Sequence, residues 1–361
     1  MIVEVDPFAD PRWDAFVEAH PDARVFHHSL WLRCLRRESG RRPLALAWEG
    51  PAGRLEGVLP LLETRGLPFV NRQPPWGPRL SSLPRTPLAG VVSDDASAAV
   101  ALLEAAMLRA RARGVPLQLK TERGDLADVA AGLARVPWRT TYVRELPEAS
   151  EQLRFGNSRN HSRIRWAVSR ARASGVSVRP AEREDDVRAW YRLYLETMRS
   201  HAVPPRSLGF FKELWRRLRP RGYLRLLLAE QRTPAGIRLL AGSIFLLFGR
   251  TVFYAFTGAT RAGLGAHPHD LIQWQAMHDA CDAGYRRYDL GEVARGQEGL
   301  AAFKRKWGAD PASIFHYYAP PIANLDDPFA AEAESSLRTT LWQRVPLPAT
   351  RAAGLVAYAF M

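Results

Sequence analysis

Residues 288–308, YDLGEVARGQEGLAAFKRKWG, gather carboxylates and ammonium groups around a glycine-rich stretch. Asp289 and Glu292 are among the carboxylates, while Lys304 and Lys306 carry the ammonium groups. Carboxylates can accept protons, and cations can bind phosphate or stabilise developing negative charge. The same pattern is typical of a capped turn followed by a solvated basic helix face, because charge clusters usually lie on the surface. Both interpretations stay open on these residues alone.

Three elements would position these side chains. Residues 286–290 are predicted to form a short strand, 291–299 a flexible glycine loop, and 300–307 a helix with apolar residues at helical spacing. A strand, a loop and a helix start commonly hold a substrate over rigid scaffold ends. Asp289 could equally be a turn residue before Gly291.

The length and charge of the chain favour a two-domain protein with an anionic partner. A chain of 361 residues is too long for one ordinary core. Its net charge is +14, and nearly all the basic residues are arginine. Since arginine binds phosphate and carboxylate bidentately, a nucleic acid, a nucleotide or a phospholipid surface is expected. A high-GC genome would explain why arginine is used in place of lysine. It would not explain why basic residues outnumber acidic residues.

Several classes of protein are excluded. Cys34 and Cys281 lie inside helical patterns, which predicts neither a disulfide framework nor a metal site and fits a reducing cytosol. No apolar run approaches the ~18–20 residues of a membrane span, and the acidic N-terminus is no signal peptide. The histidine pairs lack acidic or thiol partners at metal-ligand spacing, so no metal is expected. These pairs are His27 with His28 and His267 with His269.

The remaining patterns outline two α/β halves. Residues 44–63 and 226–248 both read as strand, a turn containing Pro-Ala-Gly, then strand, which indicates two copies of one unit. In the first half, 26–37 is predicted to be a helix capped by Ser29. Residues 66–90 form a proline-rich loop around Trp76, a functional loop or a stiffened connector.

Two further segments are basic. Residues 157–174 form a predicted helix rich in arginine, including Arg159, Arg163 and Arg170. This helix could follow a tRNA acceptor stem or a phospholipid face through phosphate contacts, or it could be an amphipathic helix with a solvated side. The tail, 335–361, mixes arginine with apolar residues and could lie on a membrane surface or dock onto the protein body.

Four segments in order resemble the Fem-type branch of the GNAT acyltransferase superfamily, most closely its exopolysaccharide- and exosortase-associated members. They are 254–258 (YAFTG), 266–274 (AHPHDLIQW), 284–291 (GYRRYDLG) and 303–308 (FKRKWG). The resemblance implies an α/β (α+β) fold with two tandem GNAT-like domains, each a mixed central sheet flanked by helices. The expected limits are 1–148 for the first domain, 149–325 for the catalytic domain and 326–361 for a C-terminal tail.

The resemblance also implies an activity. Family members include N-acyltransferases that move an amino acid from aminoacyl-tRNA to an amine of a peptidoglycan or other cell-envelope precursor, which can be lipid-linked. Aminoacyl-tRNA would be a co-substrate, with no further cofactor. An acyl-CoA-dependent N-acyltransferase in exopolysaccharide assembly and a non-catalytic protein binding an anionic partner are the alternatives. The usual GNAT pyrophosphate loop is not cleanly present, because 261–266 has its glycines one place early. The expected location is the cytoplasm, with peripheral contact at the inner face of the membrane as an alternative.

By position, Lys304 matches the lysine of the family's Phe-Lys pair, near the acyl donor and acceptor. It could stabilise an oxyanion or bind the donor's phosphate. Asp289 or Glu292 could accept the ammonium proton or orient the amine. The residues expected to bind substrate are Phe303, Tyr254, Trp31, Trp76, Arg295 and Lys306, and those expected to bind tRNA or another anion are Arg159, Arg163 and Arg170.

Overall fold

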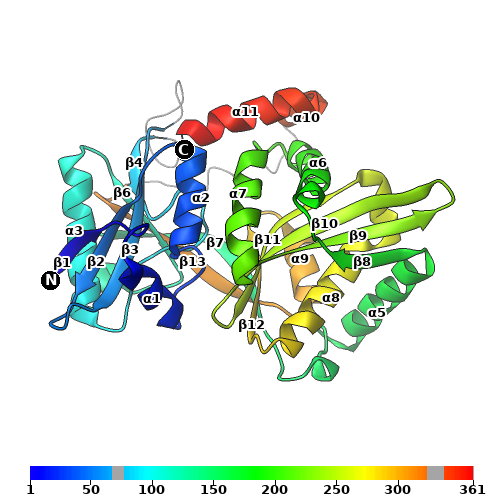
Figure 1. Ribbon diagram of the computed structural model, residues 1–361, viewed down its shortest axis with the longest axis horizontal. Helices are drawn as coiled ribbons and strands as arrows, with labels where there is room; N and C mark the ends of the chain where they lie inside the picture. The colour runs from blue at the N-terminus through cyan, green and yellow to red at the C-terminus, as the bar shows by residue number, and fades with distance from the viewer. Residues whose placement is uncertain (67–76, 323–336, 361) are drawn as a thin grey trace. The chain divides into compact units, whose positions relative to one another are not determined.

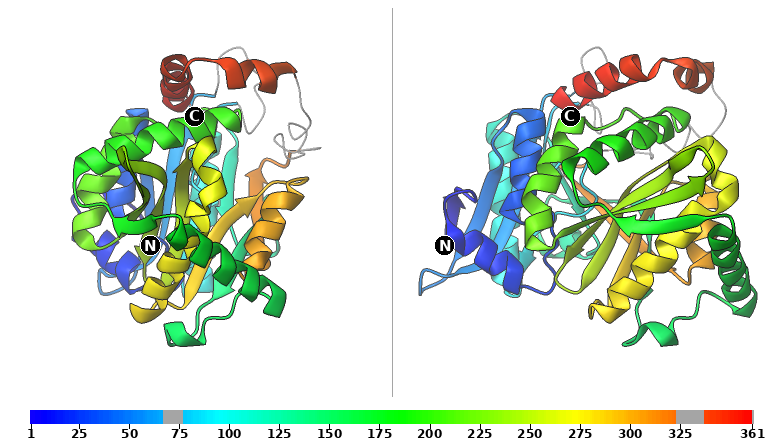
Figure 2. Two further views of the ribbon diagram at one scale, coloured as in Figure 1. Left: turned by 90° about the vertical axis from the view of Figure 1, so that its right-hand side faces the viewer. Right: turned by 45° about the vertical axis from the view of Figure 1, so that its right-hand side comes forward.

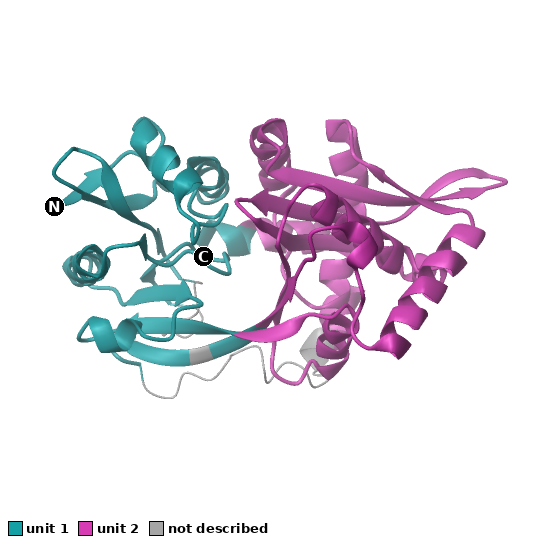
Figure 3. Cartoon of the chain, turned by 90° about the horizontal axis from the view of Figure 1, so that it is seen from below, with its two compact units in different colours: residues 1–140, 313–331, 356–361 teal, residues 141–312, 332–355 magenta. Residues whose placement is uncertain are grey.

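The computed structural model describes residues 1–66, 77–322 and 337–360. Trp76 therefore lies outside the described residues. Contacts divide the chain into two compact units (Figure 3). Unit 1 comprises Met1–Thr140, Ser313–Ala331 and Val356–Met361, and unit 2 comprises Thr141–Ala312 and Glu332–Leu355. Three of the four boundaries fall inside β7, β13 and α11, and neither unit is one continuous stretch. The domain limits expected from the sequence stay predictions.

Unit 1 is built on a mixed sheet (Figure 1). Its strands run in the order β1-β2-β3-β4-β6-β13, with β5 beside β3. β4 and β6 are parallel, while β13 pairs antiparallel with β6, Phe315 opposite Thr121. The bounds are β1 Ile2–Val5, β2 Leu44–Glu49, β3 Leu55–Thr64, β4 Arg79–Ser81, β5 Val92–Ser93, β6 Leu117–Thr121, β7 Ala134–Glu145 and β13 Asp310–Ala319.

Helices cover the sheet of unit 1. The alanine-rich α3 packs on β2 and β3 through Leu102, Leu103 and Ala106. It begins where the Asp95 carboxylate accepts a hydrogen bond from the Ala98 N–H at 2.8 Å. The helices are α1 Pro11–Ala19, α2 Ser29–Ser39, α3 Ala96–Ala112 and α4 Leu126–Val129.

The predicted cap of α2 is off by one residue. His28 is the N-cap, and its Nδ1 accepts from the Leu30 N–H at 3.1 Å. Ser29 instead donates its hydroxyl to Asp14, 2.5 Å away. A carboxylate from another helix thus takes the serine side chain, and the neighbouring imidazole serves as the cap.

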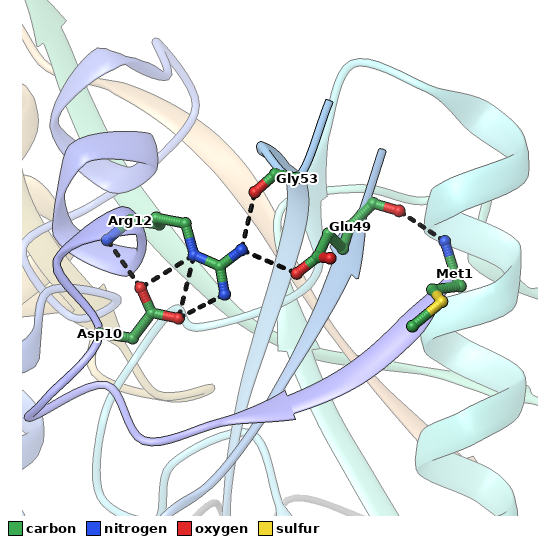
Figure 4. Close-up of polar contacts among 5 residues, drawn as sticks. All are labelled: Met1, Asp10, Arg12, Glu49 and Gly53. Atoms are coloured by element: carbon green, nitrogen blue, oxygen red, sulfur yellow. Dashed lines mark hydrogen bonds and ion pairs between the residues drawn. The ribbon is translucent and has the colours of Figure 1, made fainter. Parts of the chain in front are cut away.

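One arginine ties the N-terminal part of unit 1 together (Figure 4). The Arg12 guanidinium donates to the Asp10 carboxylate, to Glu49 Oε2 at 2.8 Å and to the Gly53 carbonyl at 2.7 Å. The N-terminal ammonium of Met1 donates to the Glu49 carbonyl at 2.6 Å. These contacts link the start of α1 to the β2–β3 turn, and they use the arginine's donors within the fold.

In unit 2 the strands follow the order β7-β12-β11-β10-β9-β8. Strands β8, β9, β10 and β11 pair antiparallel in that order, and β11 and β12 run parallel. The new bounds are β8 Val176–Pro180, β9 Leu224–Thr233, β10 Gly236–Phe248, β11 Thr251–Ala259 and β12 Arg287–Val293. The expected fold class, mixed sheets flanked by helices, is confirmed.

Two layers of helices flank this sheet. α6 and α7 cover one face, where α6 packs on β10 and β11, and α5 and α8 cover the other (Figures 1 and 2). α5 runs alongside α8 and buries Ile164 and Val168 in the same core as Met277. The helices are α5 Ser158–Ala173, α6 Glu184–Ser200, α7 Leu208–Leu218, α8 Pro268–Asp282, α9 Glu298–Lys306, α10 Leu337–Arg344 and α11 Leu347–Phe360.

The glycine-rich stretch is more ordered than its sequence suggests. The predicted loop 291–299 is partly wrong, because β12 continues through Gly291 to Val293 and α9 begins at Glu298. Gly291 has φ +82°, a conformation that side chains rarely adopt. A glycine in this conformation kinks the strand where a loop was expected. The loop proper is therefore short.

Candidate functional site

The candidate site lies in unit 2 where two parallel strands stop pairing. β11 and β12 are in register only from Thr251 opposite Arg287 to Phe253 opposite Asp289. β11 also carries an irregularity beyond this point, because Ile244 and Phe245 of β10 pair with Phe256 and Tyr254. A bulge of this kind bends a strand and increases its twist. Beyond Phe253 of β11 and Asp289 of β12, the two strands thus no longer pair with each other.

Asp289 fixes the kink at the end of this ladder. Its side chain is 3% exposed, and Oδ1 accepts from the Gly291 N–H and from the Thr141 hydroxyl, both at 2.7 Å. The hydrogen bond from the Gly291 N–H is the local contact expected of a turn-forming aspartate. The second comes from β7, 148 residues away. The carboxylate therefore positions the backbone of Gly291.

Lys304 is a buried cation held against that kink. It is 4% exposed, and Nζ donates to the carbonyls of Gly291 and Glu292 at 2.7 and 2.9 Å. Burial lowers the pKa of Lys304 to about 8, although the charges of Asp289 and Glu292 act in the opposite direction. Roughly a tenth of a group with this pKa is neutral at pH 7. Two of its three ammonium hydrogens are used by carbonyls, and Nζ lies 5.9 Å from the centre of the Tyr142 ring.

The residues beside Lys304 have separate roles. Lys306 donates to the Asp270 carboxylate at 2.5 Å and lies 5.1 Å from the centre of the Phe303 ring. Phe303 itself is half-buried and contacts Trp307. Arg305 is exposed and donates to the Tyr142 hydroxyl at 3.2 Å. The basic run 304–306 thus begins with a buried cation, followed by an exposed arginine and a partly buried lysine.

The other predicted members of the segment lie nearer the surface. Glu292 is half-buried, and its carbonyl is one of the two acceptors of Lys304. Arg295 is exposed in the turn between β12 and α9, and no ion pair with a described acidic residue involves it.

Tyr254 belongs to a polar cluster between β11 and α8. Its phenol is half-buried, and burial raises its pKa, opposed by hydrogen bonding to Thr257, Ser243 and Gln273. Gln273 accepts from the Tyr288 hydroxyl at 2.6 Å. Sequence reasoning missed Gln273, although a glutamine between the apolar residues of a buried helix is a detectable signal. It also missed Thr141, for which no local signal exists.

The arginine helix presents one continuous face. Arg159, Arg163, Trp166 and Arg170 follow a spacing of four, three and four residues, which places them in one line along α5. The arginines are exposed, and no described acidic residue pairs with them. Trp166 is 61% exposed and meets His267 edge-on, with ring centroids 5.3 Å apart. We call these four residues the α5 face.

Unit 1 holds the predicted Trp31, but as a packed residue. Trp31 is 1% exposed, its Nε1 donates to Thr86 Oγ1 at 3.3 Å, and its ring meets Phe26 edge-on. Unit 1 also has a pocket of about 230 Å³, beside the ion pair of Arg24 and Glu122. None of the predicted site residues lines this pocket.

Residues 1–66, 77–322 and 337–360 contain neither a candidate metal site nor a candidate membrane-spanning helix. No group of three or more His, Cys, Asp or Glu side chains in these ranges could hold a metal ion. No helix among the described residues is both long and apolar enough to cross a bilayer.

Residues 158–305 match the family described as the acetyltransferase (GNAT) domain. The chain resembles the crystal structure of FemX, with a TM-score of 0.69 and 17% identity over 88% of this chain and 96% of that one. It also resembles the C-terminal domain of a putative lysylphosphatidylglycerol synthetase from Agrobacterium fabrum, with a TM-score of 0.57 and 12% identity over 87% and 92%. A third similar structure is L-PGS from Bacillus licheniformis, with a TM-score of 0.52 and 11% identity over 90% and 96%. These structural similarities establish a shared GNAT-like fold, and no curated protein sequence matches the chain.

Proposed function

We propose that this protein is an N-acyltransferase that moves an amino acid from aminoacyl-tRNA to an amine of a cell-envelope precursor. The match of residues 158–305 to the acetyltransferase family supports acyl transfer in general. The observation that carries the choice of donor is the α5 face, whose exposed arginines have no described acidic partner. The acceptor would be a peptidoglycan precursor or another envelope precursor, including a lipid-linked one.

The α5 face suits a structured RNA better than a small donor. Arg159 and Arg170 are eleven residues apart, which is about 16 Å along a helix. A row of arginines at this length can follow a phosphate backbone. Trp166, in the middle of the row, offers a ring on which an unpaired base can stack, an interaction that contributes about 1–3 kcal/mol.

Lys304 has the properties that the chemical step needs. The acceptor amine attacks the ester carbonyl of the aminoacyl group, which becomes a tetrahedral oxyanion. Collapse of this intermediate breaks the ester C–O bond, forms the amide and releases the tRNA hydroxyl. The Lys304 ammonium stabilises the oxyanion, an effect that is large in a water-poor setting.

The protons of the reaction can be balanced within the same segment. The attacking nitrogen loses one proton, and the departing tRNA oxygen gains one. We assign the first to a carboxylate of the segment, Asp289 or Glu292, and the second to Lys304, whose pKa of about 8 lets it give up a proton near neutral pH. Asp289 additionally orients the Gly291 carbonyl that binds Lys304.

A coenzyme A thioester is the second candidate donor, favoured by the description of the matching family as an acetyltransferase domain. Against it, the segment where a pyrophosphate loop is expected folds as a short 3₁₀ helix, Arg261–Ala266. A protein of this fold that binds an anionic partner without turnover is the third candidate.

The donor is tested by direct competition. The purified chain is incubated with aminoacyl-tRNA or with acetyl-CoA, and binding is followed by filter retention and calorimetry. We expect the chain to bind aminoacyl-tRNA and not acetyl-CoA. Binding of acetyl-CoA without binding of aminoacyl-tRNA would contradict the proposal of a tRNA donor. Turnover is then followed as loss of the aminoacyl ester in the presence of an amine-bearing muropeptide or aminolipid.

A set of variants separates the three candidates. Lys304→Ala is expected to bind aminoacyl-tRNA but not to transfer its amino acid. Lys212→Ala is the matched control, because Lys212 of α7 is a partly buried lysine paired with Glu184 at 2.7 Å. Tight anion binding without turnover on any donor would favour the non-catalytic alternative. Peptidoglycan genes as neighbours support the first candidate, and polysaccharide-export genes the second.

A further inference from the structure

Three large apolar side chains of the C-terminal helices are exposed. Leu341, Leu355 and Val356 are 63%, 49% and 57% exposed, within sixteen residues of one another. Single exposed apolar side chains are ordinary, whereas a cluster marks a contact surface. The exposed apolar residues of α10 and α11 are therefore a candidate contact surface.

One side of α11 packs against the protein, and the other side, which we call the open side, is exposed to solvent. On the packed side, Gly354 lies so close to Pro205 that a Cβ at this position would be 2.2 Å from the Pro205 carbonyl oxygen. On the same helix, the Tyr358 hydroxyl accepts a hydrogen bond from Arg85 at 3.0 Å. The open side is apolar apart from one arginine. Its exposed residues are Pro348, Ala349, Arg351, Ala352, Leu355, Val356 and Ala359.

The charge of this segment identifies the partner. Residues 337–361 contain no aspartate or glutamate, and Arg344 and Arg351 are exposed beside the apolar residues. An apolar helix face flanked by arginines and free of acids is the pattern of a helix that lies in a bilayer interface, where the arginines reach anionic headgroups. A protein partner would not require this complete lack of acid.

We propose that the open side of α11, with Leu355, Val356 and Arg351, docks on an anionic phospholipid surface together with Leu341 and Arg344 of α10. The apolar side chains enter the boundary of headgroups and acyl chains, and the guanidinium groups contact phosphates. This surface is separate from the α5 face and from Lys304, so membrane contact and acyl transfer can be measured independently.

Vesicle flotation tests the proposal. The full chain is mixed with phosphatidylcholine vesicles, with or without phosphatidylglycerol. Binding is expected only with phosphatidylglycerol, and it should weaken with salt. Leu355→Glu with Val356→Glu should abolish flotation, and each of Arg344→Gln and Arg351→Gln should weaken it about fivefold. Unchanged melting temperatures verify folding.

Three controls make the outcome decisive. Ile237→Glu changes another exposed apolar residue, 67% exposed in β10, and should leave flotation unchanged. Changing Arg159, Arg163 and Arg170 to Gln should weaken flotation less than the tail variants. Equal binding to phosphatidylcholine, no binding to either vesicle, or dependence on the α5 arginines alone overturns the proposal. So does self-association in lipid-free buffer that Leu355→Glu removes, because the face would then bind a second copy.

Discussion

Two basic regions of unit 2 place their cations in opposite environments. Lys304 is 4% exposed, with its ammonium between two carbonyls and its pKa lowered by burial to about 8. The arginines of the α5 face are exposed and lack described acidic partners. Burial strengthens one electrostatic contact and makes proton release possible near neutral pH, whereas exposure lets several cations meet a long polyanion. In the proposed function, the first environment is the site of the chemical step and the second is the surface that binds the donor.

A third cation shows that exposure alone does not mark a binding residue. Arg12 in unit 1 lies at the surface, yet Asp10, Glu49 and the Gly53 carbonyl use its donors (Figure 4). The α5 arginines are the same residue type, and none of the described acidic residues pairs with them. Pairing, rather than residue type or net charge, therefore distinguishes a structural arginine from one left for a ligand.

The largest expected effect is on transfer by Lys304→Ala. Removing a positioned oxyanion partner typically costs about 100- to 1,000-fold in turnover. Affinity for aminoacyl-tRNA should change little, because the α5 face is intact. Single-turnover transfer and filter binding, measured on the same preparation, check both halves. Full transfer by Lys304→Ala would remove Lys304 from the mechanism.

The reverse pattern is expected when the α5 face is changed. Replacing Arg159, Arg163 and Arg170 with Gln should weaken tRNA binding at least tenfold. It should also lower the slope of log affinity against log salt by about 0.7–0.9 for each phosphate that the protein no longer neutralises. The transfer rate at saturating tRNA should be retained. Arg216→Gln is the control, because Arg216 is exposed but paired with Glu184 at 2.6 Å. An unchanged salt slope contradicts a role of the α5 face in phosphate binding.

The environment of Lys304 predicts a measurable titration. The chain has four lysines, Lys120, Lys212, Lys304 and Lys306, so carbon-13 labelling of their ε-carbons gives a simple NMR spectrum. The Lys304 resonance should titrate near pH 8, and transfer should fall severalfold per pH unit above it as the charged form is lost. A midpoint at the ordinary lysine value near 10.5 would show that the ammonium is solvated.

The same pKa predicts how stability changes with pH. Because the folded-state pKa of Lys304 lies below the unfolded value, the unfolded chain binds more protons between about pH 8 and 10.5. The contribution of Lys304 to the free energy of unfolding therefore increases with pH across that window. Comparing urea unfolding of the wild type and Lys304→Met at both ends of the window isolates this contribution.

The smallest effect is expected at the paired arginine. Arg12→Ala should slightly lower Tm, since it loosens the contact between α1 and the β2–β3 turn, and exposed pairs contribute little. Transfer and tRNA affinity should not change. A loss of tRNA affinity comparable with that of the α5 variants would break the distinction between paired and unpaired arginines.

Local patterns in the sequence predicted most elements of both units and grouped Asp289, Glu292 and Lys304 in one segment. Hydrophobic periodicity specifies strands such as β9 to β11 because their cores are continuous. It did not predict that Gly291 to Val293 belong to β12, since a glycine at φ +82° has the same sequence signature as a loop. The proposed roles of Asp289, Glu292 and Lys304 themselves stay predictions.

What the sequence could not show is contact between distant segments. Thr141 reaches Asp289 across 148 residues, and no spacing rule connects a threonine in one strand to an aspartate in another. The burial of Lys304 is a similar case. Its sequence context, Phe303 to Gly308, is typical of a solvated basic helix, and only the packing of α9 on β12 turns the lysine inward.

The assembly of unit 1 from distant segments has a consequence for synthesis. β6, Leu117–Thr121, pairs with β13, which the ribosome completes only at Ala319, almost 200 residues later. At ordinary translation rates this takes about 10–40 s. During that interval the nascent first half keeps an open strand edge and lacks the Tyr317 side chain of its core. Vectorial folding of this half must therefore finish from the C-terminal side, and an N-terminal fragment expressed alone should expose an edge for aggregation or chaperone binding.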